Sequence, residues 1–187
     1  MYNTLIKTMY FYCEENDMEN IVLIGMPSSG KSTVGKPLSE KMGMGFIDTD
    51  KLILDREKKP LRDIVVEDGL DNFLKIQETV ILGLDVNRHV ISTGGSVVYN
   101  TKAMEHLKKH GLIVYLKLDI DKLEERITTK RRFARNKEQS FLDIYNERTP
   151  LYEKYAHVII DCNCKRLDAI VNEISAIYKN KVKREMV

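Results

Sequence analysis

Short hydrophobic runs alternate with amphipathic segments along most of this chain. The run Ile21-Val22-Leu23-Ile24 is aliphatic at every position, which is typical of a strand buried on both faces of a parallel sheet. Other short apolar runs predict four more strands, at residues 45–48, 89–92, 112–116 and 157–161. Because predicted helices separate these strands, the pattern indicates an α/β fold with a mainly parallel central sheet.

The segments between the strands carry the end signals of helices. A helix over 31–42 follows a glycine turn and ends near Gly43, and one over 60–69 begins with proline and ends with glycine. The remaining predicted helices cover 50–58, 71–84, 101–110, 121–129, 140–155 with an interruption at Pro150, and 166–178. The chain has no internal repeat and no linker, so we expect a single domain over 18–187.

The composition narrows the range of partners. A net charge of +2, from 30 basic and 28 acidic residues, indicates neither nucleic acid nor a membrane surface as a partner. Residues 1–17 lack the apolar core of a signal peptide, and we expect them to form a poorly ordered extension. Three cysteines are too few for a disulfide framework. The small number of cysteines favours a protein of the reducing cytoplasm.

Residues 25–33 read G-M-P-S-S-G-K-S-T, a full match to the phosphate-loop pattern G-x-x-x-x-G-K-[ST]. Glycine backbones can turn successive N–H groups toward a phosphate, and the following helix adds the positive end of its dipole. Lys31 would reach the β- and γ-phosphates, and the Ser32 hydroxyl would bind Mg²⁺. The pattern therefore predicts ATP and Mg²⁺ as cofactors, with contacts from Gly25, Pro27, Ser28, Ser29, Gly30, Lys31, Ser32 and Thr33. The alternative is a glycine turn without a ligand.

A phosphate loop is shared by kinases, GTPases and ATPases. Guanine specificity usually depends on an N-K-x-D run after a later strand, and residues 136–139 read N-K-E-Q, without the decisive aspartate. Asp48 and Asp50 follow a predicted strand at the sheet edge where α/β proteins bind ligands. A carboxylate there can support a metal ion or accept a hydrogen bond from a substrate hydroxyl. Alternatively, Asp50 caps the next helix.

The motifs GMPSSGKSTVG, FIDTD, ISTGG and ERTPLY, taken together, resemble those of the shikimate kinase family. The resemblance implies a three-layer P-loop kinase fold with a five-stranded parallel sheet, a helical substrate-binding segment and a mobile lid at about 130–139. It implies ATP-dependent phosphorylation of a hydroxyl of a small molecule, shikimate, by a monomeric protein. By position, Asp48 resembles the residue that orients Mg²⁺ and assists proton removal, and Asp50 the residue that holds substrate hydroxyls. Gly94 and Gly95 resemble the backbone that approaches the acceptor.

The remaining roles implied by the resemblance concern arginines. Arg148 matches the arginine that binds the shikimate carboxylate; without the family, it would also suit a surface ion pair with Glu147 or Glu153. Residues 130–137 contain five basic residues and fit a lid, in which Arg131 or Arg132 meets the charge of the transferring phosphoryl group. A solvated loop is the alternative for this segment. Arg126 precedes it and is expected to flank the adenine.

The chain departs from the family pattern at three places. Where the family has G-E-x-x-F-R-x-x-E, residues 69–77 read G-L-D-N-F-L-K-I-Q, so Leu74 and Gln77 replace a charged pair that helps bind the acceptor. Ser96 replaces the third glycine of a G-G-G loop, and the lid motif R-P-L-L is absent. Two alternatives to shikimate phosphorylation therefore stay open: a kinase for another small hydroxylated metabolite, or a nucleotide-binding regulatory module without turnover.

Overall fold

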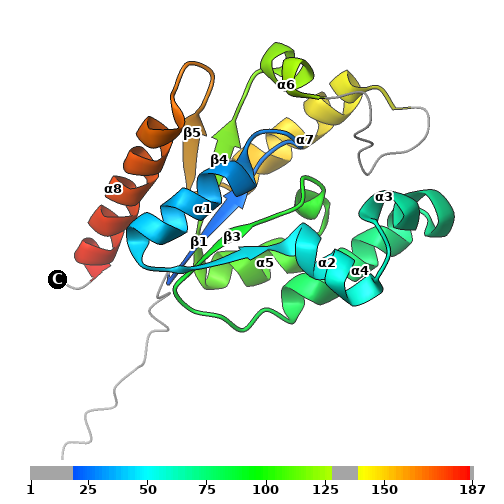
Figure 1. Ribbon diagram of the computed structural model, residues 1–187, viewed down its shortest axis with the longest axis horizontal. Helices are drawn as coiled ribbons and strands as arrows, with labels where there is room; N and C mark the ends of the chain where they lie inside the picture. Colours follow the sequence, from blue (N-terminus) through cyan, green and yellow to red (C-terminus); the bar gives the residue numbers. More distant parts are fainter. Residues whose placement is uncertain (1–18, 128–138, 186–187) are drawn as a thin grey trace, which may run out of the picture.

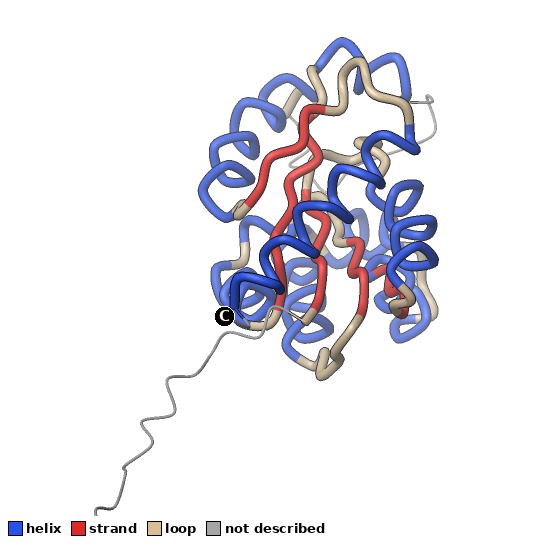
Figure 2. The backbone as a smooth tube through the Cα atoms, turned by 90° about the vertical axis from the view of Figure 1, so that its left-hand side faces the viewer, coloured by secondary structure: helices blue, strands red, loops and turns tan. Residues whose placement is uncertain are grey.

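The computed structural model describes residues 19–127 and 139–185, with side chains to residue 181. Its centre is a five-stranded sheet in the order β2-β3-β1-β4-β5, and all neighbouring strands are parallel. The strands are β1 (Asn20–Ile24), β2 (Gly45–Asp48), β3 (His89–Ser92), β4 (Gly111–Lys117) and β5 (Val158–Asp161). Helices lie on both sides of this sheet (Figures 1 and 2). The predicted α/β fold with a five-stranded parallel sheet is confirmed.

The helices form the two outer layers. On one face, α1 packs against α8 and against the central strands, and on the other face α5 and α7 pack against β4. Outside α5 lies α4, which also contacts α2. The helix bounds are α1 (Lys31–Met42), α2 (Thr49–Glu57), α3 (Leu61–Asp63), α4 (Leu70–Leu82), α5 (Thr101–Lys109), α6 (Ile120–Arg126), α7 (Phe141–Tyr155) and α8 (Leu167–Glu185).

The strand register decides which loops meet. Every residue of β1 is buried, and β1 lies between β3 and β4. Leu23 pairs with Ser92, and Ser92 pairs with Asp48, so the carboxyl ends of β1, β2 and β3 reach the same edge of the sheet. Open parallel sheets bind their ligands at this edge. The phosphate loop, the segment at 48–50 and the loop at 93–96 are therefore neighbours in space.

The segment 60–69, predicted as one α-helix, has a different form. Only Leu61–Asp63 is α-helical, and Ile64–Asp68 forms a π-helical turn, η1. A π turn holds an extra residue and therefore changes which side chains face inward. Here Ile64 is fully buried, whereas Val65 and Val66 line a cavity. A short 3-10 helix, η2 (Val97–Tyr99), was not predicted at all.

The predicted interruption of a helix at Pro150 is wrong, because α7 continues through this residue. Proline lacks the N–H that would bond to the preceding turn. The helix nevertheless buries Arg148, Tyr152 and Tyr155 on either side of Pro150. These tertiary contacts hold both halves in one helix. In the described part of the chain, no helix is long and apolar enough to cross a membrane.

Candidate active site

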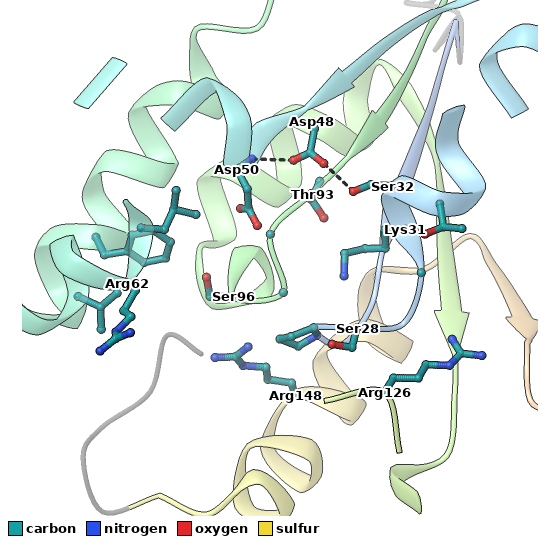
Figure 3. A pocket seen from close by; sticks show the side chains of 18 of the residues that line it. Ser28, Lys31, Ser32, Asp48, Asp50, Arg62, Thr93, Ser96, Arg126 and Arg148 are labelled. Atoms are coloured by element: carbon teal, nitrogen blue, oxygen red, sulfur yellow. Dashed lines mark hydrogen bonds between the residues drawn. The ribbon is translucent and has the colours of Figure 1, made fainter. Parts of the chain in front are cut away.

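A cavity of about 810 Å³ opens at the carboxyl ends of β1, β2 and β3. Figure 3 shows side chains from several elements reaching into it. Its lining combines the phosphate loop, the segment after β2, the loop after β3 and three arginines from separate helices. The polar, charged and glycine residues of this lining include Ser28, Gly30, Lys31, Ser32, Asp48, Asp50, Arg62, Gly94, Gly95, Ser96, Arg126 and Arg148.

The phosphate loop is a tight curl. Gly25, Ser28 and Gly30 have positive φ angles of 144°, 67° and 95°. A Cβ at Gly25 would lie 2.9 Å from the carbonyl oxygen of Leu116, so the position has no room for another residue. Lys31 Nζ donates to the carbonyl oxygens of Gly25 at 2.9 Å and of Met26 at 2.8 Å. Such a curl at the amino end of a helix forms a site for an anion.

Oxygen ligands for a metal ion lie beside this curl. Ser32 Oγ donates to Asp48 Oδ2 at 2.5 Å (Figure 3). It also lies 3.1 Å from Ser92 Oγ. Hydroxyl and carboxylate oxygens suit Mg²⁺, which usually takes one or two protein ligands and completes its shell with water and phosphate. The described residues contain no cluster of three or more histidine, cysteine or acidic side chains for a metal. The pair Ser32 and Asp48 therefore fits Mg²⁺ bound together with a nucleotide.

Asp48 also caps the next helix. Its Oδ1 accepts a hydrogen bond from the Asp50 N–H at 3.1 Å, and α2 begins at Thr49. The alternative in which Asp50 is the cap is therefore wrong. Because Asp48 fulfils this role, the carboxylate of Asp50 is directed to the cavity (Figure 3).

The loop after β3 packs closely over Asp50. The Gly94 N–H donates to Thr49 Oγ1 at 3.2 Å. A Cβ on Gly94 would lie 2.5 Å from Asp50 Oδ1 and 2.6 Å from Gln77 Nε2, and one on Gly95 would lie 2.7 Å from Pro27 Cδ. These contacts with the protein itself already require glycine. Contact of this backbone with an acceptor stays a prediction.

Two departures from the family pattern contact each other. Ser96 Oγ donates to Gln77 Oε1 at 3.1 Å, across 19 residues of sequence and inside the protein. Gln77 is fully buried, and its Nε2 has no hydrogen-bond partner among the described residues. Because Nε2 and Asp50 Oδ1 approach the same side of Gly94, the amide dipole faces a carboxylate. Ser96 and Gln77 thus form one neutral buried pair beside Asp50.

We expect Ser96→Ala to lower the free energy of unfolding by about 1–3 kcal/mol, because Gln77 Oε1 would remain buried without a donor. Urea unfolding followed by circular dichroism measures the change. Thr79→Ala is the control: its hydroxyl is exposed and bonds to the Lys75 carbonyl oxygen at 2.8 Å. That control should change stability by no more than about 0.5 kcal/mol. Equal stabilities of wild type and Ser96→Ala would show that the buried bond contributes nothing.

Arg148 is held inside the protein. Its side chain is 1% exposed, so the alternative of a surface ion pair is wrong. Arg148 Nε donates to the Tyr99 hydroxyl at 3.1 Å, and its guanidinium carbon lies 4.9 Å from the centre of that ring. Burial raises the pKa of Tyr99, although the hydrogen bond from Arg148 acts in the opposite direction. The phenol therefore stays neutral and serves as an acceptor.

A second tyrosine ties α7 to the glycine loop. The Tyr152 hydroxyl donates to the Gly95 carbonyl oxygen at 2.5 Å, and the ring is completely buried against Tyr115. Tyr152 and Arg148 lie on the same helix, one turn apart. The loop at 93–96 and the guanidinium group of Arg148 are therefore positioned by one element.

Arg126, the last residue of α6, lies over the phosphate loop. Its Nη1 is 3.9 Å from the place that a Cβ on Gly30 would take. Contact with adenine stays a prediction. Arg131 and Arg132 lie outside the described residues, as does most of the segment 130–139 predicted as a lid.

The structure brings together most of the side chains that the sequence singled out. Three predicted site residues are not among the described residues that line the cavity: Gly25, Ser29 and Leu74. Leu74 packs instead against the apolar cluster of Ile53, Ile64 and Phe73. Sequence reasoning missed Arg62 and Tyr99. Arg62 belongs to no motif, and Tyr99 follows the ISTGG motif without a spacing that marks it.

A comparison with known proteins identifies the family. The family model described as shikimate kinase matches residues 27–179, which is most of the chain. The chain belongs to the shikimate kinase family. A shikimate kinase from Clostridium botulinum is 40% identical over 170 residues, covering 88% of this chain and 99% of the relative. A shikimate kinase from Bacillus cereus is 32% identical over 160 residues, covering 84% of this chain and 96% of the relative.

Solved structures of shikimate kinases have the same fold as this chain. The shikimate kinase from Acinetobacter baumannii in complex with shikimate has a TM-score of 0.78 and 28% identity, covering 90% of this chain and 97% of that one. The shikimate kinase from Aquifex aeolicus has a TM-score of 0.74 and 29% identity, covering 87% of this chain and 97% of that one. The predicted family is confirmed, and this member of the shikimate kinase family keeps the fold despite its altered acceptor residues.

Proposed function

We propose that this protein transfers the γ-phosphoryl group of ATP to a hydroxyl of shikimate. One observation carries the proposal: a single cavity joins a phosphate loop to a carboxylate and a buried arginine. The phosphate loop supplies the donor side, and Asp50 and Arg148 match the hydroxyls and the carboxylate of the acceptor. Relatives named shikimate kinase, at 32% and 40% identity over most of their length, support the choice of acceptor.

On the donor side, the backbone amides of the loop and Lys31 bind the phosphates of ATP. Ser32 and Asp48 would hold Mg²⁺, which would neutralise negative charge on the nucleotide phosphates. Arg126 would contact the nucleotide near the loop, since its Nη1 lies 3.9 Å from the place that a Cβ on Gly30 would take. Arg131 or Arg132 would meet the transferring phosphoryl group. Positioning and charge neutralisation account for most of the catalysis in phosphoryl transfer.

On the acceptor side, Asp50 accepts a hydrogen bond from a substrate hydroxyl. Asp48 lies two residues earlier, at the metal site, and can receive the proton released when the hydroxyl attacks. Arg148 presents a planar guanidinium fork that suits a carboxylate. Tyr99 fixes the orientation of that fork through its hydroxyl. Gly94 and Gly95 form the floor between the two sides.

A second candidate is phosphorylation of another small hydroxylated acid. Leu74 and Gln77 favour it, because they stand where the family has a charged pair on the acceptor side. A regulatory module without turnover is less well supported, since Lys31, Ser32, Asp48 and Asp50 all remain at the cavity.

Release of ADP, measured in a coupled assay with Mg-ATP, separates these possibilities. We expect ADP release that depends on shikimate and stops when EDTA removes Mg²⁺. A panel of other hydroxy acids and sugars tests the second candidate. If another acceptor gives a higher kcat/KM than shikimate, the assignment of the acceptor is wrong. If no acceptor raises ADP release although ATP binds, the regulatory module is favoured.

A further inference from the structure

The charged residues of the cavity divide between its two ends. The lining contains four cationic side chains and two carboxylates: Lys31, Arg62, Arg126, Arg148, Asp48 and Asp50. Lys31 and Arg126 lie at the phosphate loop. Arg62 and Arg148 reach the other end, where Figure 3 shows the Arg148 guanidinium group turned toward Arg62. The cavity therefore offers positive charge at two places, and nucleotide phosphates account for only one of them.

Arg62 has no side-chain partner among the residues that the structure describes. In the part of the chain that the structure describes, its exposed side chain makes no hydrogen bond and no ion pair. Of the basic side chains at 56–59, Arg56 pairs with Glu57 at 3.2 Å, and Lys59 pairs with Glu67 and Asp68, each at 2.8 Å. Lys58 makes no ion pair with a described residue, but it lies outside the described lining of the cavity. The charge of Arg62 is therefore available to a ligand.

Local structure holds Arg62 at the cavity. Arg62 lies in α3, directly before the π turn η1, and the buried side chain of Ile64 anchors this turn. The lining beside it in sequence is apolar, with Leu61, Val65 and Val66, and Phe73 of α4 lines the same cavity. A guanidinium group on an apolar wall is suited to a carboxylate, because the wall excludes part of the competing water and the planar fork gives two parallel hydrogen bonds.

The neighbouring helix α4 contributes no cation to this end of the cavity. Its lining residue is Phe73, while Leu74 packs into the apolar cluster with Ile53 and Ile64. Lys75 is exposed and lies outside the described lining. Of the described lining residues, Arg62 is thus the cation that accompanies Arg148 at the end away from the phosphate loop.

We propose that Arg62 and Arg148 bind one carboxylate of the acceptor between them, and that Arg62 is a specificity-determining residue of the reaction. This inference rests on the proposed function, because it concerns the acceptor side of the same cavity. The acceptor class is a hydroxylated monocarboxylic acid. Its carboxylate lies between α3 and α7, and its hydroxyls face Asp50.

Steady-state kinetics of Arg62→Leu test this inference with two acceptors, shikimate and its uncharged methyl ester. We expect the variant to raise KM for shikimate about tenfold. This effect is at the low end of those seen when a hydrogen bond to a charged group is lost, because Arg62 is exposed to solvent. Its kcat should stay within about threefold, since the contact is made equally in the ground and transition states. With the ester, KM should change less than about twofold, because no charge is left to recognise. Arg62→Lys should fall between wild type and Arg62→Leu.

Arg56→Leu is the matched control, since it removes the same charge from an exposed arginine outside the lining. This control variant should leave KM and kcat for shikimate unchanged. If wild type phosphorylates shikimate and Arg62→Leu has the same KM, the inference is overturned and the proposed function stands. Equal losses with shikimate and with the ester also overturn it, because the effect would not depend on charge. If wild type does not act on shikimate, the proposed function fails, and the inference fails with it.

Discussion

Lys31→Ala should lower kcat by at least about a thousandfold, the largest loss that we expect from a single substitution. Lys31 follows the second glycine of the phosphate loop, and its ammonium group lies within the curl at 2.8 and 2.9 Å from two carbonyl oxygens. In the reaction this charge offsets the negative charge on the transferring phosphoryl group. Its removal therefore affects the transition state more than the binding of the acceptor. The coupled ADP assay with saturating shikimate measures the loss.

The control for this variant is Lys36→Ala, which removes an exposed lysine from the same helix, away from the described lining. Its kcat should stay within about twofold of wild type. Circular dichroism confirms that both variants fold. A folded Lys31→Ala variant with wild-type turnover would mean that the phosphate loop is not the donor site.

Asp48→Asn should lower kcat by about two to four orders of magnitude and raise the Mg²⁺ concentration needed for half-maximal rate. The amide keeps the shape of the side chain and can still cap α2 through its oxygen. It loses the negative charge that supports the metal ion and receives the proton. Mg²⁺ titration of the ADP assay distinguishes this effect from a structural one.

Asp55→Asn, on the exposed side of α2, provides the comparison for Asp48→Asn. It removes the same charge from a residue of the helix that Asp48 caps, and it should leave the Mg²⁺ dependence unaltered. If Asp48→Asn lowers the rate without any change in Mg²⁺ dependence, Asp48 acts only on the proton. If neither rate nor Mg²⁺ dependence changes, its assignment to the metal site is wrong.

The sequence predicted the fold well where patterns are local. The buried run at 21–24, the glycine turn and the helix after it were each readable from a few consecutive residues, and all five strands were found. The π turn at 64–68 was missed, because it depends on how Ile64 packs against residues distant in sequence. Pro150 was misread for the same reason: local preference favours a break, whereas buried side chains on both sides keep α7 continuous.

The residues of the candidate site were likewise predicted where they belong to local motifs and missed where they depend on tertiary contacts. Lys31, Ser32, Asp48 and Asp50 stand in motifs whose spacing follows from strand and helix geometry. By contrast, the contact between Ser96 and Gln77 joins a loop to a separate helix, and no local pattern links them. Arg62 lines the cavity from α3, the short helix before the π turn that sequence reasoning missed. Contacts that depend on tertiary packing were therefore not predicted, even where the residue itself departs visibly from the family pattern.

A single-turnover experiment with ATP labelled at the γ-phosphate tests the central claim most directly. Purified protein, Mg²⁺, labelled ATP and shikimate are mixed, and the products are separated. We predict that the label passes to shikimate as a phosphate ester, with one ester formed for each ADP. Label found as free inorganic phosphate, or ADP formation that does not depend on shikimate, would contradict phosphoryl transfer between the two sides of this cavity.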